Sequence, residues 1–528
     1  MSIIIGRNKN LRRLLEFQAE VRPNQIFIIF IDKDENVETL TYREFNLKVN
    51  QFANYLLGIG IKKGDFVTCN LPNSTGFCLT WFATSKIGAI MIPTNTMSRA
   101  DEMQYMLEHS GSTTLVTDPE FMEMINSIKP QCPKLRNIIL YRAEEAAPGT
   151  VLLNDILKDQ PAELKKIVDV GPMDVSNMLY TSGTTARPKG VLLTHGNSLW
   201  IGESMACEQK LTHEDRHICV LPLFHVNAQY ISFMPTITAG ASIIVCERFS
   251  ASRYYRHVRE YGATITSLVA TNVRQLLAQP RHPHDAENKM RRICFAIAIT
   301  DEQWDEFEAR FNCTLHDLYG LTETLAPCTF TAMHAKRKRG SVGLPAFGIE
   351  IKIVDDERKE IPIGEVGEIA VCGTPGIQLM KGYYKNPEAT AAVLDENNWF
   401  YTGDFGKMDD EGYVYFVDRK KDVIKRAGEN IAACEVERVL NEHPAISETA
   451  VIGVPDEMRD EAVKAFIILK EGHNPTEEEL KAYCGEKLAK FKIPQYIEVV
   501  ASFPKTSIGK IQKNILKKAE LEKLNRKG

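Results

Sequence analysis

Strand-like and helix-like segments alternate through the first 170 residues, and this pattern limits the possible folds more than any other feature. Residues 66–69 (FVTC) form an apolar run typical of a buried strand, and residues 75–86 show the apolar spacing of a helix. Residues 89–92 (AIMI) predict the next strand, which Pro93 ends, and residues 113–117 (TTLVT) repeat the pattern. Such alternation predicts an α/β fold of parallel sheets covered by helices.

The chain is long enough for several domains, and its texture changes in the second half. At about 150 residues per domain, 528 residues correspond to roughly three or four units. Short β-rich segments such as residues 368–372 (EIAVC) and 412–417 (GYVYFV) replace the alternating pattern, and the charged residues 418–422 (DRKKD) follow them. We therefore expect a boundary at these charges, between an N-terminal domain of residues 1–419 and a C-terminal domain of residues 420–528.

Composition and charge exclude several classes of function. The formal net charge is −5 at pH 7, so nothing in the overall charge favours binding to nucleic acid or to an anionic membrane surface. The twelve cysteines are scattered without a C-x-x-C pair, which is typical of reduced thiols rather than of disulfides or a zinc ribbon. No apolar stretch reaches the ~20 residues of a transmembrane helix, so we expect a cytoplasmic location. The oligomeric state, including a homo-oligomer, stays open.

The densest set of candidate ligands is the loop at residues 180–190 (YTSGTTARPKG). Its small residues allow the backbone to approach an anion, its amides and hydroxyls can bind phosphate oxygens, and Arg187 and Lys189 add positive charge. It is not a Walker A loop, because no Gly-Lys-Ser/Thr ends it; the alternative is a glycine-rich surface turn. Residues 174–180 predict a strand that enters the loop, and Asn197 begins a predicted helix after it, so we expect a strand–loop–helix junction.

Three further segments carry side chains that suit nucleotide chemistry, although each is weak alone. Residues 319–323 (YGLTE) follow a strand-like run, and Glu323 could hold a magnesium ion that bridges phosphates, or could cap a helix. Residues 401–404 (YTGD) predict a tight turn ending in an acid that could bind ribose hydroxyls, or an ordinary Gly-Asp turn. Lys510 follows a glycine that would expose it, but a single surface lysine carries no information by itself.

Residues 213–217 (HEDRH) match the H-E-x-x-H pattern of zinc proteases, but they do not predict a zinc site. That pattern requires a helix that places both histidines on one face. Residues 218–224 (ICVLPLF) follow at once and predict a strand instead.

Taken together and in this order, the segments resemble the adenylate-forming superfamily of acyl-CoA synthetases (AMP-binding enzymes) over nearly the whole chain. The motifs that carry the resemblance are residues 180–190, 221–225 (LPLFH), 319–323, 401–404, 416–437 (FVDRKKDVIKRAGENIAACEVE) and 504–510 (PKTSIGK). The resemblance implies a large N-terminal domain of parallel, αβα-layered sheets with a β-barrel subdomain, and a small mobile α+β C-terminal domain. It implies an AMP-forming acid–CoA ligase that uses ATP, CoA and Mg²⁺ and a small-molecule carboxylic acid.

The resemblance also implies a role for each matched residue. The β- and γ-phosphates and the leaving pyrophosphate would be bound by Thr181, Ser182, Gly183, Thr184, Thr185 and Lys189. Tyr319, with Gly320 next to it, would stack on adenine. The α-phosphate and Mg²⁺ would be held by Thr322 and Glu323, and the ribose would be bound by Asp404 with Arg419. The implied catalytic residues are Lys510, Thr184, Glu323 and His225. Lys421 matches the hinge, and Gly428 and Glu429 belong to the segment that faces CoA.

The chemistry of this family explains why such residue types are needed. A carboxylate is a poor acyl donor, so its attack on the α-phosphate of ATP forms a mixed anhydride with AMP and expels pyrophosphate. Charge builds on the phosphoryl oxygens, so catalysis is mostly positioning and cationic stabilisation. The second step brings a thiol to the acyl carbonyl, and the change of arrangement favours a mobile domain on a short hinge.

One departure from the family pattern bears on the acid. The family carries a Gly-Gly-Ala-Pro-like segment before a helix that ends Phe-x-x-Arg-Phe; here that helix ends at residues 307–311 (FEARF), and residues 295–299 (FAIAI) replace the glycine-rich segment. Phe295 would shorten the acyl channel, which favours a small acid over a long-chain fatty acid.

This segment, with residues 182–188, 222–229, 459–466 and 489–494, is similar to the carnitine/crotonobetaine–CoA ligases. Aromatic faces recognise the quaternary ammonium group of such acids. We expect an acyl pocket that contains His225, Tyr230, Phe295 and Ala296, with Trp200 in the core.

Other functions stay open on the sequence. A medium-chain fatty acid or aryl acid–CoA ligase would use the same nucleotide residues with another pocket. An enzyme that loads a carrier protein is disfavoured, because no carrier domain follows Lys510. A nucleotide-binding pseudoenzyme or regulator would have no need to keep Lys189, Glu323, Asp404 and Lys510 together.

Overall fold

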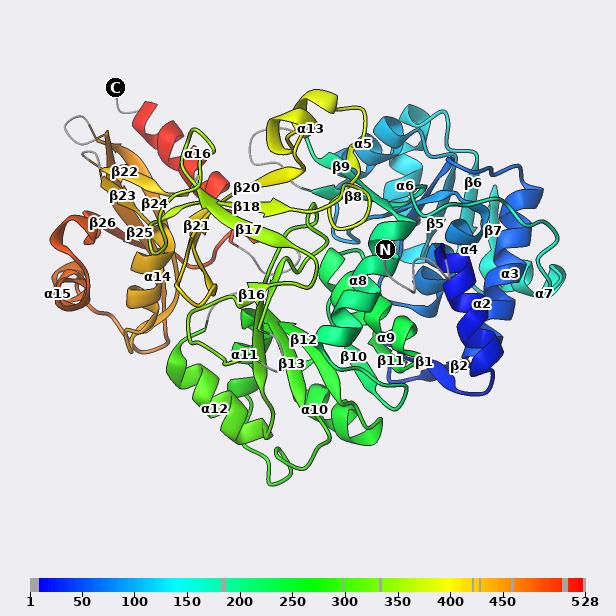
Figure 1. The fold of residues 1–528 in the computed structure, drawn as a ribbon, viewed down its shortest axis with the longest axis horizontal. Helices are drawn as coiled ribbons and strands as arrows, with labels where there is room; N and C mark the ends of the chain where they lie inside the picture. The colour runs from blue at the N-terminus through cyan, green and yellow to red at the C-terminus, as the bar shows by residue number, and fades with distance from the viewer. Residues whose placement is uncertain are drawn as a thin grey trace.

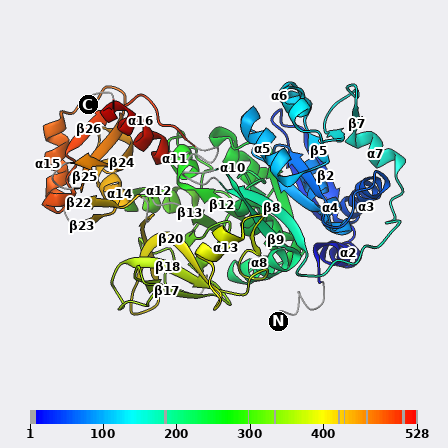
Figure 2. The same ribbon diagram turned by 90° about the horizontal axis from the view of Figure 1, so that it is seen from above.

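A computed structural model describes residues 9–181, 187–296, 299–331, 335–419, 422–426, 429–456, 460–505 and 511–525, and all structural statements below concern these residues. Four sheets organise this part of the chain (Figure 1). Seen from above, the sheet of the C-terminal part lies at one end of the molecule, and strands β5 (Thr114–Thr117) and β7 (Thr150–Leu152) lie toward the other (Figure 2). The predicted α/β class is confirmed.

Two large, mostly parallel sheets make up the N-terminal part. The first has the order β16-β15-β14-β13-β12-β10-β11-β1-β2 and the second the order β19-β9-β8-β4-β3-β5-β6-β7. The strands of the first are β1 (Ile26–Ile31), β2 (Val37–Thr41), β10 (Arg216–Cys219), β11 (Ser242–Cys246), β12 (Ile265–Val269), β13 (Arg292–Ala296), β14 (Leu315–Tyr319), β15 (Thr329–Phe330) and β16 (Leu344–Pro345). The remaining strands of the second are β3 (Phe66–Asn70), β4 (Ile90–Pro93), β6 (Asn137–Leu140), β8 (Val175–Thr181), β9 (Lys189–Thr194) and β19 (Gly382–Tyr383).

Helices cover and separate these sheets. They are α2 (Leu11–Val21), α3 (Tyr42–Gly58), α4 (Thr75–Ile87), α5 (Ala100–Ser110), α6 (Met122–Ile128), α7 (Leu153–Asp159), α8 (His195–Glu208), α9 (Met234–Ala239), α10 (Ala251–Glu260), α11 (Ala270–Leu277), α12 (Asp301–Phe311) and α13 (Pro387–Val393), with a π-helix, η3 (Asn227–Phe233). None of the helices in the described part of the chain has the length and apolar character that crossing a bilayer requires.

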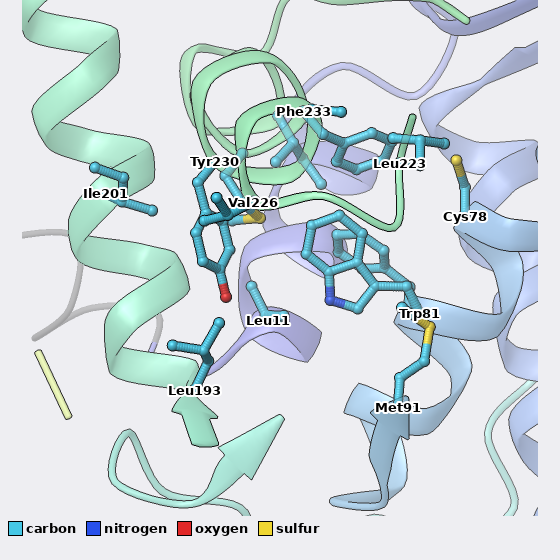
Figure 3. Packing of buried hydrophobic residues seen from close by; sticks show 14 of the residues in the cluster. Leu11, Cys78, Trp81, Met91, Leu193, Ile201, Leu223, Val226, Tyr230 and Phe233 are labelled. Atoms are coloured by element: carbon cyan, nitrogen blue, oxygen red, sulfur yellow. The ribbon is translucent and has the colours of Figure 1, made fainter. Parts of the chain in front are cut away.

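The central helix α4 explains why the core holds both sheets together. All of its residues are buried, because it is apolar on every side rather than along one stripe. Ser74 caps its start by accepting a hydrogen bond from the backbone of Phe77, and Gly88 ends it in the left-handed conformation. Trp81 packs against Phe233 of η3, with ring centroids 5.2 Å apart (Figure 3). The predicted helix at residues 75–86 is therefore confirmed, with Ile87 added.

The remaining two sheets are smaller. The third is antiparallel, with the order β17-β18-β20-β21, and it includes most of the short β-rich segments at residues 368–372 and 412–417. Its strands are β17 (Glu350–Val354), β18 (Gly367–Cys372), β20 (Trp399–Met408) and β21 (Val414–Arg419). The C-terminal sheet contains β22 (Ile424–Arg426), β23 (Glu429–Ile431), β24 (Ile446–Asp456), β25 (Asp460–Leu469) and β26 (Tyr496–Val499), with helices α14 (Ala433–Asn441), α15 (Glu477–Lys487) and α16 (Lys513–Asn525).

The segment around the expected phosphate loop is a hairpin. β8 and β9 pair antiparallel, with Tyr180 opposite Gly190 and Thr181 opposite Lys189. Helix α8 begins only at His195, where Thr194 forms its capping box. The predicted strand and helix are confirmed, but the expected direct strand–loop–helix junction is wrong. The apolar residues after the loop pair with β8 before the chain turns into the helix.

The two histidines of the H-E-x-x-H pattern lie in different environments. His213 is exposed in a loop, whereas His217 lies in strand β10 and is buried. Neither ring nitrogen of His217 has a hydrogen-bond partner among the described residues. Burial lowers the pKa of His217 to about 3, although the nearby Asp215 raises it slightly. The ring is therefore neutral at pH 7 and resists protonation.

We expect His217→Leu to weaken the acid sensitivity of the fold. Between pH 6.5 and about 3 the unfolded chain binds one more proton at this residue than the folded chain, so wild-type stability falls as the pH falls. The variant should have similar stability at pH 7 and gain about 2 kcal/mol relative to the wild type at pH 5. Denaturant unfolding at both pH values measures this, with His213→Gln as the exposed control. If unfolding of the wild type and of His217→Leu depended on pH in the same way, the lowered pKa of His217 would be contradicted.

Candidate functional site

Several of the expected nucleotide residues lie at the carboxyl ends of strands in the two large sheets. β8 ends at Thr181 in the second sheet, and β14 ends at Tyr319 in the first. β13 ends nearby at Ala296, and His225 follows β10 on a turn in which its backbone amide donates to Pro222. Ligands of open α/β sheets bind at this edge, so the topology gathers the candidate residues from distant parts of the chain.

The first cluster surrounds the carboxylate of Glu323. The hydroxyl of Tyr383 donates to its Oε1 over 2.8 Å, and the ammonium of Lys189 lies 4.7 Å from the centre of the Tyr383 ring. Burial raises the pKa of Glu323, and hydrogen bonds, including those from Tyr383 and Thr181, together with the charge of Lys189 oppose that rise. The cluster thus joins the two strands that flank the phosphate loop to the 319–323 segment.

The second cluster surrounds the carboxylate of Asp404. The hydroxyl of Tyr319 donates to its Oδ2 over 2.8 Å. Arg419 lies directly opposite Asp404 in the β20–β21 ladder, and its Nε is 3.9 Å from Oδ1. Asp404 is buried and Arg419 is partly exposed. Because Tyr319 begins the segment that ends at Glu323, the two clusters share one short piece of chain.

The 401–404 segment is a bulge in a strand, not the expected tight turn. It lies inside β20, and its register against β18 shifts between Glu368 and Ala370. Gly403 adopts a φ of 71°, and its amide donates to the carboxylate of Glu368 over 2.9 Å. A bulge bends a strand and re-aims its side chains, which accounts for an acid pointing at Tyr319 from the middle of a ladder.

Gly320 permits the sharp reversal after β14. A Cβ atom at this position would lie 2.8 Å from the Cα atom of Ala326 and 3.0 Å from the backbone nitrogen of Cys328. Both contacts are with backbone, which cannot move aside as a flexible side chain can. The absence of a side chain therefore lets residues 326–328 fold back against Gly320.

We expect Gly320→Ala to destabilise the protein by about 1–3 kcal/mol, because the added methyl group must displace backbone. Displacement of Tyr319 and Glu323 should also raise the KM for ATP. Thermal unfolding and steady-state kinetics measure the two effects. Gly58→Ala is the matched control, since a Cβ there meets no atom within 4 Å. Wild-type stability and KM in Gly320→Ala would refute the packing argument.

Phe295 and Ala296, both expected in the acyl pocket, lie on opposite faces of β13. Successive side chains of a strand point to opposite faces, and in β13 Phe295 and Cys294 join different core clusters. Phe295 is fully buried against Trp304 of α12, with ring centroids 5.9 Å apart at 85°. Cys294 packs in the cluster that contains Tyr230, and Ala296 packs against it. The effect of Phe295 on the acyl channel stays a prediction.

Tyr230 is likewise a core residue in this structure. It is fully buried, and its hydroxyl lies 3.3 Å from the Oγ atom of Ser198. Figure 3 shows its ring extending from η3 toward α8, beside Ile201 and Leu193. Trp200 is also buried, as expected.

The partly exposed members of the expected pocket are His225 and Ala296. The π-helix that follows His225 was not foreseen, and π-helices are frequent at functional sites.

Several expected site residues lie outside the described residues: Ser182, Gly183, Thr184, Thr185, Lys421, Gly428 and Lys510. Glu429 contributes backbone to β23. Thr322 lies in the turn between Tyr319 and Glu323, where its carbonyl accepts from the amide of Leu325. Tyr383 was missed by sequence reasoning, because its role depends on a contact with a residue sixty positions away.

The C-terminal part meets the N-terminal part beside the Asp404 cluster. Asp418 of β21 accepts from the backbone amide of Cys434, which is in α14, over 3.0 Å. Lys513 at the start of α16 forms an ion pair of 2.8 Å with Glu437. Burial lowers the pKa of Lys513, but Glu437 and Asp418 outweigh this and raise it overall. The start of α16 therefore runs beside the strand that carries Arg419.

A separate cavity does not compete with this site. It has a volume of about 210 Å³ and lies on the face of β14 that bears Asp317, beside Trp304. Its cations are already paired, Arg337 with Glu308 and Arg339 with Asp305. Within the described ranges, no group of three histidine, cysteine or acidic side chains is arranged to hold a metal ion.

Comparison with known families and proteins agrees with this geometry. Residues 15–384 match the AMP-binding enzyme family, and residues 435–510 match the AMP-binding enzyme C-terminal domain. The chain is 38% identical to a crotonobetaine/carnitine–CoA ligase of Citrobacter koseri over 519 residues, which cover 98% of this chain and all of that protein. It is 37% identical, over the same length and coverage, to a crotonobetaine/carnitine–CoA ligase of Escherichia coli.

Solved structures show the same architecture. The anthranilate–CoA ligase AuaEII in complex with anthranoyl-AMP has a TM-score of 0.88 at 28% identity, covering 98% of both chains. ATP-bound MatB from Rhodopseudomonas palustris has a TM-score of 0.86, and its apo form has 0.75, each at 27% identity over 97% of this chain and 99% of the other. Over the whole chain, the structure is thus more similar to ATP-bound MatB than to its apo form. The chain belongs to the AMP-binding enzyme family and is an AMP-forming acid–CoA ligase.

Proposed function

We propose that the enzyme activates a short betaine acid, carnitine or crotonobetaine, and transfers it to CoA. The observation that carries this proposal is similarity at 37–38% identity over 98% of the chain to ligases named for these two acids. The second candidate is an aryl acid, which is favoured by the similarity to anthranilate– and benzoate–CoA ligases at 28% and 25% identity. We rank it second because that similarity is lower.

The geometry supports a division of labour in the nucleotide site. Lys189 and Thr181, at the two ends of the phosphate loop, would bind the β- and γ-phosphates. Asp404, held by Tyr319 and opposite Arg419, would accept hydrogen bonds from the ribose hydroxyls. Tyr319 would pack against adenine. We propose the same phosphate role for Ser182, Gly183, Thr184 and Thr185, and an α-phosphate role for Thr322, from their motif positions alone.

The first step forms one bond and breaks another. An oxygen of the acid carboxylate attacks the α-phosphorus of ATP, the bond from that phosphorus to the bridging oxygen breaks, and pyrophosphate leaves. Negative charge shifts onto oxygens near Lys189, so its positive charge favours the transition state. We propose that Lys510 supplies the second cation, at the α-phosphate and the carboxylate, and that His225 borders the acid.

The residues present fit a magnesium ion that is shared with the substrate. Glu323 offers one partly buried carboxylate beside Lys189, and Mg²⁺ in nucleotide sites is commonly bound by one or two carboxylates plus phosphate oxygens. A bound Mg²⁺ would neutralise phosphate charge. The hydrogen bond from Tyr383 orients the carboxylate for that purpose.

The second step attaches the acyl group to CoA. The thiolate sulfur attacks the acyl carbonyl, and AMP leaves with the electron pair of the mixed anhydride bond. We propose that the segment with Gly428 and Glu429 faces CoA after the C-terminal domain turns about Lys421. We also propose a domain boundary between residues 419 and 420. We propose a cytoplasmic location for the enzyme.

Acid-dependent release of pyrophosphate tests the substrate. The purified enzyme is supplied with ATP, Mg²⁺ and CoA, and with carnitine, crotonobetaine, butyrate, octanoate, coumarate or anthranilate. We expect the highest kcat/KM with carnitine or crotonobetaine. Butyrate serves as the matched control, because it has the same chain length as crotonobetaine and lacks the ammonium group. A preference for butyrate, octanoate or an aryl acid would overturn the betaine assignment and leave the ligase class intact.

A further inference from the structure

Two side chains of helix α5 contact the phosphate-loop hairpin. Tyr105 and His109 are one helical turn apart, and their rings stack with centroids 5.3 Å apart and planes inclined by 17°. Both side chains are partly buried. They come from the loop-facing side of a helix that otherwise buries Met103, Met106 and Leu107 in a core cluster. The pair therefore lies where α5 meets β8 and β9.

His109 holds the strand that enters the loop. Its Nδ1 atom lies 2.8 Å from the hydroxyl of Tyr180, one residue before Thr181. Burial raises the pKa of Tyr180, so its hydroxyl stays protonated and can donate to Nδ1. Burial and the nearby Lys385 lower the pKa of His109, so the ring is neutral at pH 7 and accepts that hydrogen bond.

Tyr105 holds the strand that leaves the loop. Its hydroxyl donates to the carbonyl oxygen of Pro188 over 3.0 Å, one residue before Lys189. The guanidinium of Arg187 lies 5.1 Å from the centre of the Tyr105 ring, in a cation–π contact. One helix thus restrains both ends of the loop and one of its two cations.

A third contact closes the arrangement from the other side. The backbone amide of Tyr384 donates to the carbonyl of Gly190 over 2.8 Å, and the Tyr384 ring packs edge-on against His109 at 5.4 Å. The ammonium of Lys385 donates to the carbonyl of His109 over 3.0 Å. The same short segment carries Tyr383, which binds Glu323. The α5 pair is therefore connected to both the phosphate loop and the candidate magnesium ligand.

We propose that Tyr105 and His109 are positioning residues for ATP, which hold the two ends of the 181–189 loop at the separation that the triphosphate requires. This inference rests on the proposed phosphate role of the loop. Restraining a loop before the ligand arrives reduces the entropy lost on binding, so the pair should act on ATP affinity and not on the acid or on CoA. Nothing in this role requires the two residues to touch the nucleotide.

A double-mutant cycle on the hydrogen bond between His109 and Tyr180 tests the proposal. Tyr180→Phe and His109→Phe each keep an aromatic ring and remove one partner. We expect each variant to raise the KM for ATP about three- to tenfold, which corresponds to one lost hydrogen bond, with the KM for the acid and for CoA within twofold. The double variant should lose no more than the weaker-binding single variant, because both remove the same bond.

Two further variants separate positioning from packing. Tyr105→Phe removes only the hydrogen bond to Pro188 and keeps the ring beneath Arg187, so it should raise the KM for ATP about three- to tenfold. Tyr105→Leu removes both contacts and should raise the KM for ATP further. His443→Phe in the C-terminal part is the matched control, because His443 also packs on a tyrosine, Tyr483, with centroids 4.9 Å apart. Thermal unfolding is recorded for every variant.

Direct binding of a non-hydrolysable ATP analogue keeps this test separate from the substrate proposal, because it needs no acid. Unchanged analogue affinity in Tyr180→Phe and His109→Phe would overturn the positioning role. So would multiplicative losses in the double variant, or equal changes in every Michaelis constant that follow the loss of thermal stability.

Discussion

Glu323→Gln is expected to reduce acid-dependent exchange of labelled pyrophosphate into ATP by at least about 100-fold. The substitution keeps the shape of the side chain and its hydrogen bond from Tyr383, but it removes the negative charge beside Lys189. A neutral amide is a poor Mg²⁺ ligand. Weaker Mg²⁺ binding reduces the stabilisation of the phosphates during adenylate formation.

The control for this variant is Glu388→Gln, which removes an exposed carboxylate from the first turn of the neighbouring helix α13. It should leave exchange within twofold of the wild type. The dependence of the residual Glu323→Gln activity on Mg²⁺ concentration adds a second readout. Wild-type exchange in Glu323→Gln, at an unchanged Mg²⁺ requirement, would remove Glu323 from the nucleotide site.

Lys510→Ala is expected to abolish adenylate formation and to spare the transfer of a supplied acyl-adenylate to CoA. The proposed role of this lysine is confined to the α-phosphate and the attacking carboxylate, which are present only in the first step. The lost cation should cost about 100-fold or more in the first half-reaction.

Rapid-quench measurement of each half-reaction checks this split. Lys517→Ala, in the C-terminal helix α16, is the control and should leave adenylate formation within twofold of the wild type. Equal losses in both half-reactions would show that Lys510 acts on folding or on domain movement rather than on adenylation.

Much of the N-terminal fold could be predicted from local patterns, because its strands and helices have distinct periods. The strand at 66–69 and the helix at 75–86 are present with ends shifted by one residue. The hairpin β8–β9 was not predicted, although β9 contains the apolar residues 191–193 (VLL), because the next helix was expected directly after the loop. The residue pattern of β9 favours a strand, but the expected direct connection from the loop to helix α8 was wrong.

The candidate site could be predicted only as a set of separate motifs. Sequence order says nothing of the hydrogen bond from Tyr319 to Asp404 or of that from Tyr383 to Glu323, which join residues 85 and 60 positions apart. The face to which Phe295 points depends on the pleat of β13 and on which side of the sheet each core cluster lies. A motif comparison aligns positions, but it does not assign side chains to the faces of a sheet.

The most direct test of the account is exchange of labelled pyrophosphate into ATP without CoA. We propose that this chain forms an acyl-adenylate from a betaine acid at the site between Lys189, Glu323 and Asp404. We expect exchange that requires crotonobetaine or carnitine and that is lost in Glu323→Gln. Once CoA is added, the reaction should yield AMP and no ADP. Exchange that is independent of any acid, or formation of ADP and orthophosphate, would contradict it.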